Sequence, residues 1–215
     1  ISPVLFIILI GDIDDWADHA TIVGFADDNS ATIVDSTMEG LLAKLEHDAR
    51  NILSFMASNA LVANDGKTTF MVLSNKKRES PETRYALKVG NALISEVDDQ
   101  KLLGVVFSSD RKWNKHIKLI VEKCQYRLYI LRHLSHLLPL KATKIAAEGL
   151  VMSIIRYCLP LYGNVRLAES DPTHSNQYKL QVVQNDMLRT IFSLKIKDRI
   201  NMKELRKHHN IKSIN

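Results

Sequence analysis

A pair of adjacent aspartates, Asp27 and Asp28, lies between two β-prone runs near the start of the chain. Residues 22–25 predict a buried strand, and residues 31–34 predict a second one. Because the two aspartates and the asparagine after them favour a turn, the segment predicts a hairpin with two carboxylates at its tip. Neighbouring carboxylates repel each other unless a cation lies between them, and Mg²⁺ prefers such oxygen ligands. A solvated turn without a metal is the alternative interpretation.

The composition is that of a folded protein, because 46% of the 215 residues are hydrophobic and 25% are charged. This length suits one large domain or two small ones. The first residues, Ile1–Ile10, are strongly apolar but lack a basic leader, and they are fewer than the ~20 residues of a membrane span. We expect no signal peptide and no membrane partner, and we interpret a chain that begins inside an apolar run as a fragment.

Charge is divided unevenly along the chain. Residues 1–110 carry 9 Lys and Arg against 17 Asp and Glu, whereas residues 111–215 carry 20 against 7. The resulting net charges of −8 and +13 predict cation binding in the first part and polyanion binding in the second. The change in character near Asp110 predicts a domain boundary there.

Residues 1–110 predict an arrangement of hairpins with packed helices. Ser2–Ile13 predicts a helix that is apolar on nearly every face and is therefore buried. Ser36–Glu39 matches a capping box, and the apolar spacing behind it predicts an amphipathic helix to Met56, lying on the sheet of the aspartate hairpin. The other expected elements are a turn at Asn64–Gly66, a strand over Lys67–Leu73, a charged loop over 75–84, a hairpin over Tyr85–Val97 that turns at Gly90–Asn91, and a strand over Leu102–Phe107. Gly104 in this last strand allows a bulge or a close approach of another backbone.

Residues 111–215 predict helices alone. Trp113–Leu138 reads as one long basic helix with an apolar face, and Pro139 ends it. Further helices are expected over Lys141–Leu159, Tyr178–Leu194 and Asn201–His208, with a polar loop over 164–176. The predicted fold class is α+β, with an all-helical second half.

Several short motifs in this order resemble the reverse transcriptase of non-LTR (LINE-like, jockey-type or RTE-type) retrotransposons. Phe25-Ala26-Asp27-Asp28 is similar to the F/Y-x-D-D box of that family, and Asn64–Thr68 is similar to its N-x-x-K-T motif. The remaining similar segments are Ile1–Phe6, Leu102–Val105 followed by Trp113 and His116–Ile117, Arg156–Tyr157 with Tyr162–Gly163, and Gln184 with Arg189. The resemblance covers nearly the whole chain.

The resemblance implies a partial polymerase palm over residues 1–110, and a basic helical thumb with the C-terminal region over 111–215. Such enzymes are RNA-directed DNA polymerases that extend a DNA primer on an RNA template from deoxynucleoside triphosphates by two-metal nucleotidyl transfer. Asp27 and Asp28 would hold two Mg²⁺ ions in the intact enzyme, with Asp27 the firmer ligand. Lys67 would lie near the triphosphate and neutralise the leaving group.

The resemblance also implies contacts to the primer and the duplex. Phe25 and Ala26 would lie beneath the primer terminus, and the backbone of Leu103 and Gly104 would approach the primer. The cations that would contact phosphates of an RNA–DNA duplex are Lys112, Lys115, Lys118, Lys123 and Arg127. A structural interpretation without a functional role stays open for the cations, as solvated side chains, and for Gly104, as a plain bulge. Trp113, at the start of an amphipathic helix, suits the core better than a base-stacking platform.

The chain also departs from the family pattern. The family's third metal-binding carboxylate, its Gln-Gly pair, its fingers region, an endonuclease domain and a zinc knuckle have no counterpart in the printed sequence. We therefore expect this chain to bind Mg²⁺ weakly, to position no nucleotide and to be inactive by itself.

Two other classes of function stay open on the sequence. One is a non-catalytic nucleic-acid-binding module from a decayed or domesticated element, and the other is a structural protein whose basic helices bind a protein partner. The only cysteines, Cys124 and Cys158, suit a reducing interior, and the resemblance implies the nucleus or the cytoplasm.

Overall fold

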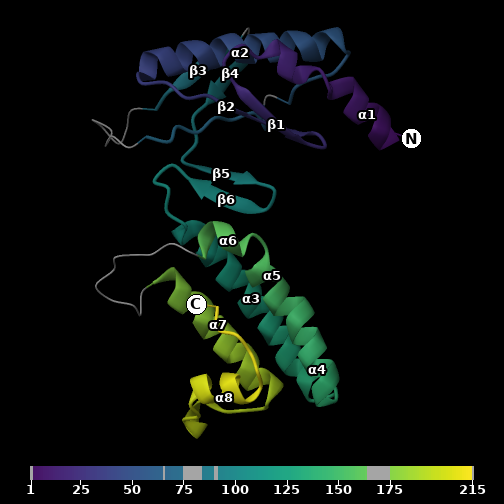
Figure 1. Ribbon diagram of the computed structural model, residues 1–215, viewed down its shortest axis with the longest axis vertical. Coiled ribbons are helices and arrows are strands. Elements are labelled where there is room, and N and C mark those ends of the chain that lie inside the picture. Colours follow the sequence, from purple (N-terminus) through teal and green to yellow (C-terminus); the bar gives the residue numbers. More distant parts are fainter. Residues whose placement is uncertain (1, 65, 75–83, 90–91, 164–174, 215) are drawn as a thin grey trace. The chain divides into compact units, whose positions relative to one another are not determined.

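The computed structural model describes residues 2–64, 66–74, 84–89, 92–163 and 175–214 (Figure 1). The chain divides into two compact units, residues 1–98 and 99–215. The sequence predicted the boundary about twelve residues later, near Asp110. Over the described residues the fold is α+β, with helices and three separate two-stranded antiparallel sheets. None of the described helices has the length and the apolar character that crossing a membrane requires.

The first helix, α1 (Ser2–Ile10), is shorter than predicted and exposed. Val4, Leu5, Ile7 and Ile8 are between 58% and 68% exposed, so the prediction of a buried helix is wrong. An apolar composition indicates that a helix should be buried, but it does not provide the neighbouring element that buries it. Neither hydrophobic cluster of the described residues includes α1.

A short 3₁₀ helix, η1 (Ile13–Trp16), follows, and it begins at Ile13, where the sequence predicted the end of the first helix. Its Ile13 is buried, and the Trp16 ring lies 5.8 Å from the Phe55 ring on α2. This aromatic contact holds the start of the chain against α2.

The predicted aspartate hairpin is present as β1 (Thr21–Phe25) and β2 (Asp28–Thr32). Phe25 pairs with Asp28, so the turn consists of Ala26 and Asp27, and Asp28 belongs to the second strand instead of the turn. Ala26 takes a positive φ of 55°, a conformation that alanine adopts only under constraint. The predicted burial is wrong, because Val23 is 65% exposed and Phe25 is 64% exposed.

Helix α2 (Met38–Ser58) confirms the predicted amphipathic helix. Its cap is Thr37 rather than the Ser36 of the predicted capping box: the Thr37 hydroxyl accepts the Gly40 N–H at 3.1 Å. Its apolar face covers the sheet of β3 (Ala86–Val89) and β4 (Ala92–Ser95), and not the aspartate hairpin as predicted. The residues of this small core are Leu42, Leu45, Ala49, Leu53, Phe70, Leu87, Val89 and Ile94.

The segment between α2 and β3 departs from the prediction. The turn after Asn64 is present, because Lys67 N–H and Thr68 N–H both donate to the Asn64 carbonyl at 3.0 Å. The predicted strand over Lys67–Leu73 is absent, and the segment contributes only an isolated parallel bridge between Phe70 and Glu96. The β3–β4 hairpin confirms the prediction over 85–97, although its predicted turn and most of the predicted charged loop lie outside the described residues.

The second unit begins with a hairpin where the sequence predicted one strand. Strands β5 (Asp99–Leu102) and β6 (Val105–Ser108) pair with Leu102 opposite Val105. Leu103 and Gly104 have φ of 46° and 85°, and two positive φ values are the signature of a type I′ hairpin turn. Gly104 therefore serves a tight turn and not a bulge, which was one of the two roles that the sequence left open.

The helices of the second unit follow the prediction closely. They are α3 (Asn114–Ser135), α4 (Leu140–Ala147), the π-helical segment η2 (Glu148–Met152), α5 (Ser153–Arg156), α6 (Leu159–Tyr162), α7 (Asn176–Ile191), the short 3₁₀ helix η4 (Ile196–Asp198) and α8 (Met202–His208). The predicted helix over 141–159 breaks at Cys158, which has a φ of 54°. Most of the predicted loop over 164–176 lies outside the described residues.

One hydrophobic core holds these helices together. Helix α3 packs against α4, α5 and α7, and β6 lies against α3. The fully buried residues of this core include Ile117, Leu128, Leu131, Ile155 and Leu188. Trp113 is partly buried against this core, with its ring 5.5 Å from Phe107, as the sequence predicted for a core tryptophan.

Candidate functional site

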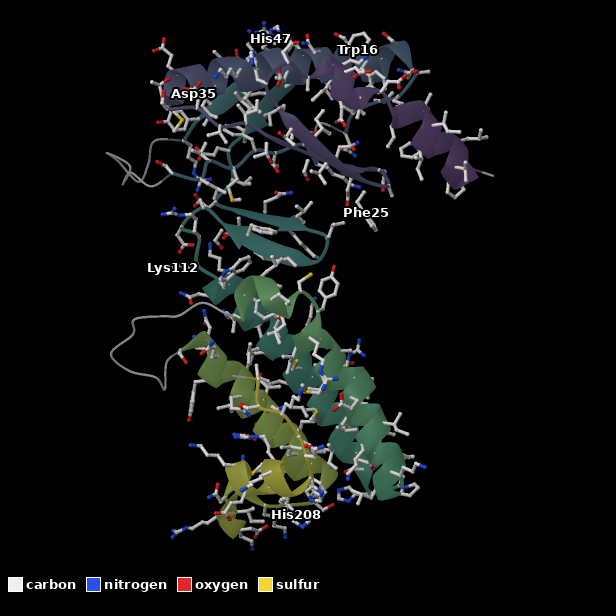
Figure 2. The ribbon with its side chains drawn as sticks, viewed as in Figure 1. Trp16, Phe25, Asp35, His47, Lys112 and His208 are labelled. Carbon is white, nitrogen blue, oxygen red and sulfur yellow. The ribbon has the colours of Figure 1, made fainter. Side chains whose placement is uncertain are left out.

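The hairpin places Asp27 and Asp28 side by side at an exposed tip. Neither carboxylate has a hydrogen-bond or ion-pair partner among the described residues. Phe25 projects from the same tip into solvent (Figure 2), and Ala26 forms the turn. Four predicted residues are therefore adjacent, and the two carboxylates keep all their oxygen lone pairs for a ligand.

The third carboxylate that two-metal chemistry uses is not at this tip. Among the described residues, the one group of three or more potential metal-ligating side chains is His19, His47 and Asp48, which includes neither aspartate of the hairpin. The tip therefore brings two carboxylates together without a third from the described part of the chain, and the expected weak Mg²⁺ binding stays a prediction.

Lys67 is exposed and follows the Asn64 turn without entering a strand. It forms no ion pair with Asp27 or Asp28 in the described part of the chain. Lys67 therefore does not begin a strand as predicted, and its position near a bound triphosphate stays a prediction.

The Leu103–Gly104 turn is held by a residue that the sequence reasoning did not assign to it. The Tyr157 hydroxyl donates to the Leu103 carbonyl at 2.5 Å, and a Cβ on Gly104 would stand 3.5 Å from the Tyr157 ring. The turn backbone thus already has a close neighbour within the second unit. The Arg156–Tyr157 motif was the signal that could have indicated Tyr157, but the 54-residue separation hides the contact.

The five predicted duplex-binding cations differ in whether an acidic side chain already neutralises their charge. Lys115 forms an ion pair with Asp99, and Lys118 lies 4.0 Å from Glu122. Hydrogen bonds from the Lys115 ammonium and the Ser108 hydroxyl hold the pKa of Asp99 below its ordinary value of 3.8. Lys115 thus stabilises the β5–β6 hairpin against α3, so it is only partly available for a phosphate.

The other three cations have no acidic partner in the described part of the chain: Lys112, Lys123 and Arg127. Lys123 and Arg127 lie one helical turn apart on α3, with Tyr126 between them, 66% exposed. We call Lys123, Tyr126 and Arg127 the α3 cationic face. Unpaired cations beside an exposed aromatic ring are a combination that nucleic-acid-binding surfaces use.

His116 lies in the first turn of α3, and its exposed fraction is only 4%. The Val106 N–H donates to its Nδ1 at 3.3 Å, while its Nε2 is buried without a hydrogen-bond partner and its ring meets Tyr162 edge-on at 4.9 Å. Burial, and to a lesser extent the charge of Lys123, lowers the pKa of His116 from 6.5. Burial therefore favours the neutral imidazole, whose ring packs against Tyr162.

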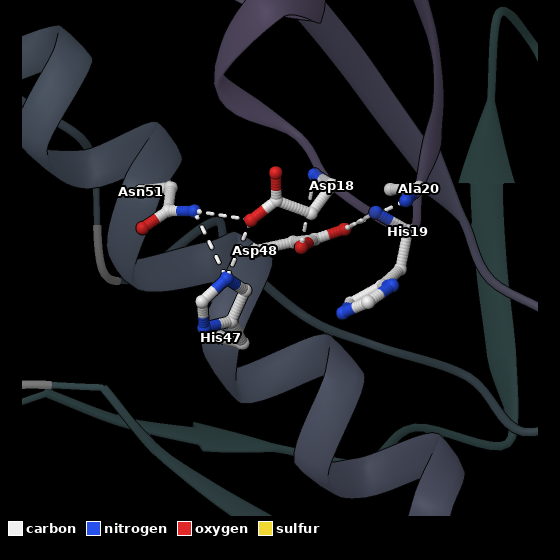
Figure 3. Close-up of polar contacts among 6 residues, drawn as sticks. All are labelled: Asp18, His19, Ala20, His47, Asp48 and Asn51. Atoms are coloured by element: carbon white, nitrogen blue, oxygen red, sulfur yellow. Dashed lines mark hydrogen bonds and ion pairs between the residues drawn. The ribbon is translucent and has the colours of Figure 1, made fainter.

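A buried carboxylate in the first unit organises the segment that leads into β1 (Figure 3). Asp48 on α2 is 1% exposed, and it accepts the backbone N–H groups of Asp18, His19 and Ala20 at 3.3, 2.9 and 2.6 Å. Such multiple backbone donors stabilise a buried carboxylate. The bonds hold the beginning of the aspartate hairpin against α2.

Two exposed imidazoles flank this carboxylate. His19 and His47 have ring centroids 5.7 Å apart, and the ligand atoms of His19, His47 and Asp48 all lie within 4.8 Å of one another. Asp18 Oδ2 lies 2.6 Å from His47 Nε2, and this hydrogen bond lowers the pKa of Asp18 from 3.8. We call His19, His47 and Asp48 the histidine–aspartate triad, which is a possible metal-binding group.

Sequence reasoning missed the triad. Its single signal is Asp48, which stands three residues after Leu45 and four before Ile52 on the apolar face of α2. A charged residue on such a face must find partners. The partners lie about thirty residues upstream, so no local spacing motif marks them.

Comparison with models of protein families, with curated proteins and with solved structures finds no match to this chain.

Proposed function

We propose that this chain is the palm and thumb portion of an RNA-directed DNA polymerase, a reverse transcriptase of the non-LTR retrotransposon type. The observation that carries the proposal is the tip of the β1–β2 hairpin, where a Phe-Ala-Asp-Asp sequence forms a tight antiparallel turn. Adjacent strands that end in exposed, unpartnered carboxylates are the arrangement that a nucleotidyl-transfer site needs.

The donor set of this tip fits Mg²⁺, because it consists of exposed carboxylate oxygens. Bound there, Mg²⁺ would stabilise the charge that develops on the primer oxygen and on the leaving pyrophosphate. Asp27 and Asp28 would hold the ions together with a third carboxylate supplied from elsewhere. Phe25 and Ala26 would support the primer terminus, because they flank the carboxylates on the same hairpin.

The second unit would position the RNA–DNA duplex through its phosphates. The α3 cationic face supports this role, because Lys123 and Arg127 carry no acidic partner among the described residues, and Lys112 adds a third cation at the start of the helix. Contacts of this kind bind any sequence. Lys115 and Lys118 would contribute less, since Asp99 and Glu122 already compensate their charges.

The alternative is a nucleic-acid-binding module without catalytic activity. The same cationic face favours it, and it requires nothing of Asp27 and Asp28. The two proposals predict the same affinity for duplex but differ in the role of the hairpin tip.

Duplex binding is tested by fluorescence anisotropy of a labelled RNA–DNA hybrid at several salt concentrations. We expect the logarithm of the affinity to fall with the logarithm of salt with a slope of about −2 to −3, for two to three phosphate contacts. The double substitution K123E/R127E should reduce the slope by about 2. The matched control is K203E/K207E on α8, which changes the net charge equally at two other exposed lysines. Equal loss of affinity in both variants would contradict a specific role for α3.

Catalysis is tested by primer extension on an RNA template. The 215-residue chain alone should show no incorporation, and incorporation by it would contradict the partial-site interpretation. In a longer polypeptide that supplies the third carboxylate, D27A should abolish synthesis and leave duplex binding unchanged. Synthesis that survives D27A would contradict the proposed role of Asp27 as a metal ligand, and a longer polypeptide that binds duplex without any synthesis would favour the binding module.

A further inference from the structure

We propose that the histidine–aspartate triad binds a transition-metal ion of the Zn²⁺ class, and that this ion ties the start of the aspartate hairpin to α2. The site lies apart from the Asp27–Asp28 tip and shares no residue with it. The inference therefore stands or falls independently of the polymerase proposal.

The donor chemistry selects the class of metal. Two imidazoles and one carboxylate are the ligands of many Zn²⁺ sites, whereas Mg²⁺ takes oxygen ligands almost exclusively. His19 and His47 are exposed, so an ion and its remaining water ligands can reach them. Neither ring is committed to the hydrophobic core.

Asp48 keeps the capacity to bind an ion. A carboxylate offers about four lone-pair positions, and three of them accept backbone N–H groups here. Oδ1 accepts only the Asp18 N–H, at 3.3 Å, so this oxygen has the spare lone pair. Because Asp48 is buried and fixed by these bonds, it offers a preorganised anchor.

The distances require only a small closure. Ligand atoms bound tetrahedrally at ~2.0–2.2 Å from Zn²⁺ stand about 3.4 Å apart, and those of the triad lie within 4.8 Å of one another. Since the His19 side chain is exposed, its rotation can close the difference without moving α2. Asp18, 2.6 Å from His47 Nε2, acts as a positioning residue that orients the His47 ring (Figure 3).

The consequence would be mechanical. His47 and Asp48 belong to α2, whereas His19 belongs to the segment that leads into β1. An ion coordinated by all three would link α2 to this segment, in addition to the hydrogen bonds that the Asp48 carboxylate already accepts from its backbone. It would thereby fix the start of the hairpin that carries Asp27 and Asp28.

The test is titration of Zn²⁺ into the metal-free full chain, followed by calorimetry and by thermal unfolding. We expect one equivalent to bind with micromolar or tighter affinity and to raise Tm. H19Q and H47Q should each weaken binding at least tenfold and abolish the rise in Tm. D18N, which removes only the orienting carboxylate charge, should weaken binding about 10- to 100-fold while keeping the one-to-one stoichiometry.

Two controls separate this site from other ligands of the chain. H208Q removes an exposed histidine of α8, and D27N/D28N removes the carboxylates of the hairpin tip. Both variants should bind Zn²⁺ as the parent chain does. Absence of saturable one-to-one binding, or unchanged affinity in H19Q and H47Q, would overturn the proposal.

Discussion

His116 shows how burial at a single residue makes the fold sensitive to pH. Its Nδ1 accepts the Val106 N–H, so charging the ring would break this bond and place a proton in a site that is 4% exposed. The pKa of His116 is lowered in the folded chain and ordinary in the unfolded chain. The unfolded state therefore binds the proton more readily.

The sign of the pH effect follows from this difference. The stability that His116 contributes is fully present above the unfolded pKa of 6.5 and is lost as the pH falls from 6.5 toward the folded value. We expect the Tm of the parent chain to fall between about pH 7.5 and about pH 5. H116Q should flatten this dependence, because glutamine does not titrate in this range. A variant with the same slope as the parent would contradict the assignment.

The two thiols should differ in reactivity. Cys124 is buried in the α3 core, and burial raises its pKa to about 11, so about a thousandth of it is thiolate at pH 8. Cys158 is only partly buried. Maleimide should label one thiol of the native chain rapidly and both thiols in denaturant, and C158S should remove the rapid reaction. Rapid labelling of native C158S would show that Cys124 is accessible.

At the scale of elements, burial separates what the sequence could predict from what it could not. Periodicity and turn chemistry identified α2, α3, α7 and the β1–β2 hairpin, because these signals are local. Exposure depends on distant partners, so the burial of α1 and β1 was mispredicted. The strand over Lys67–Leu73 failed for the same reason, since a β-prone run without a pairing strand forms only a bridge.

The exposure of α1 has a direct consequence for stability. Because Ile8 is 68% exposed, I8Q should change the free energy of unfolding by no more than about 0.5 kcal/mol. L128A should cost about 2–5 kcal/mol, since Leu128 is 1% exposed in the second core. Urea unfolding followed by circular dichroism measures both. A loss in I8Q comparable to that in L128A would show that α1 is covered in solution.

The functional residues also differ in whether the sequence alone could predict them. The Asp27–Asp28 tip was predictable, because an aspartate pair between β-prone runs is a local pattern. The triad was not, because His19 and Asp48 meet only when α2 folds onto the segment before β1. Tyr157 at the Leu103–Gly104 turn was missed for the same reason.

At the scale of the whole molecule, the division of charge coincides with the division of structure. Residues 1–98 carry 8 Lys and Arg against 15 Asp and Glu, whereas residues 99–215 carry 21 against 9. An acidic unit that presents unpartnered carboxylates and a basic unit that presents unpartnered cations suit the two tasks of a polymerase, metal binding and duplex binding.

We propose that Asp27 and Asp28 bind the metal of a nucleotidyl-transfer site. Mn²⁺ takes the same oxygen ligands as Mg²⁺ and broadens NMR signals near it, so its addition to the labelled chain locates even a weak site. The matched control for D27N/D28N is D14N/D15N, which removes two exposed carboxylates of η1. We expect the amide signals of Ala26–Asn29 to broaden first in the parent and in D14N/D15N, and to stay sharp in D27N/D28N. Hairpin broadening that persists in D27N/D28N, or that never appears while other acidic segments broaden, would contradict the account.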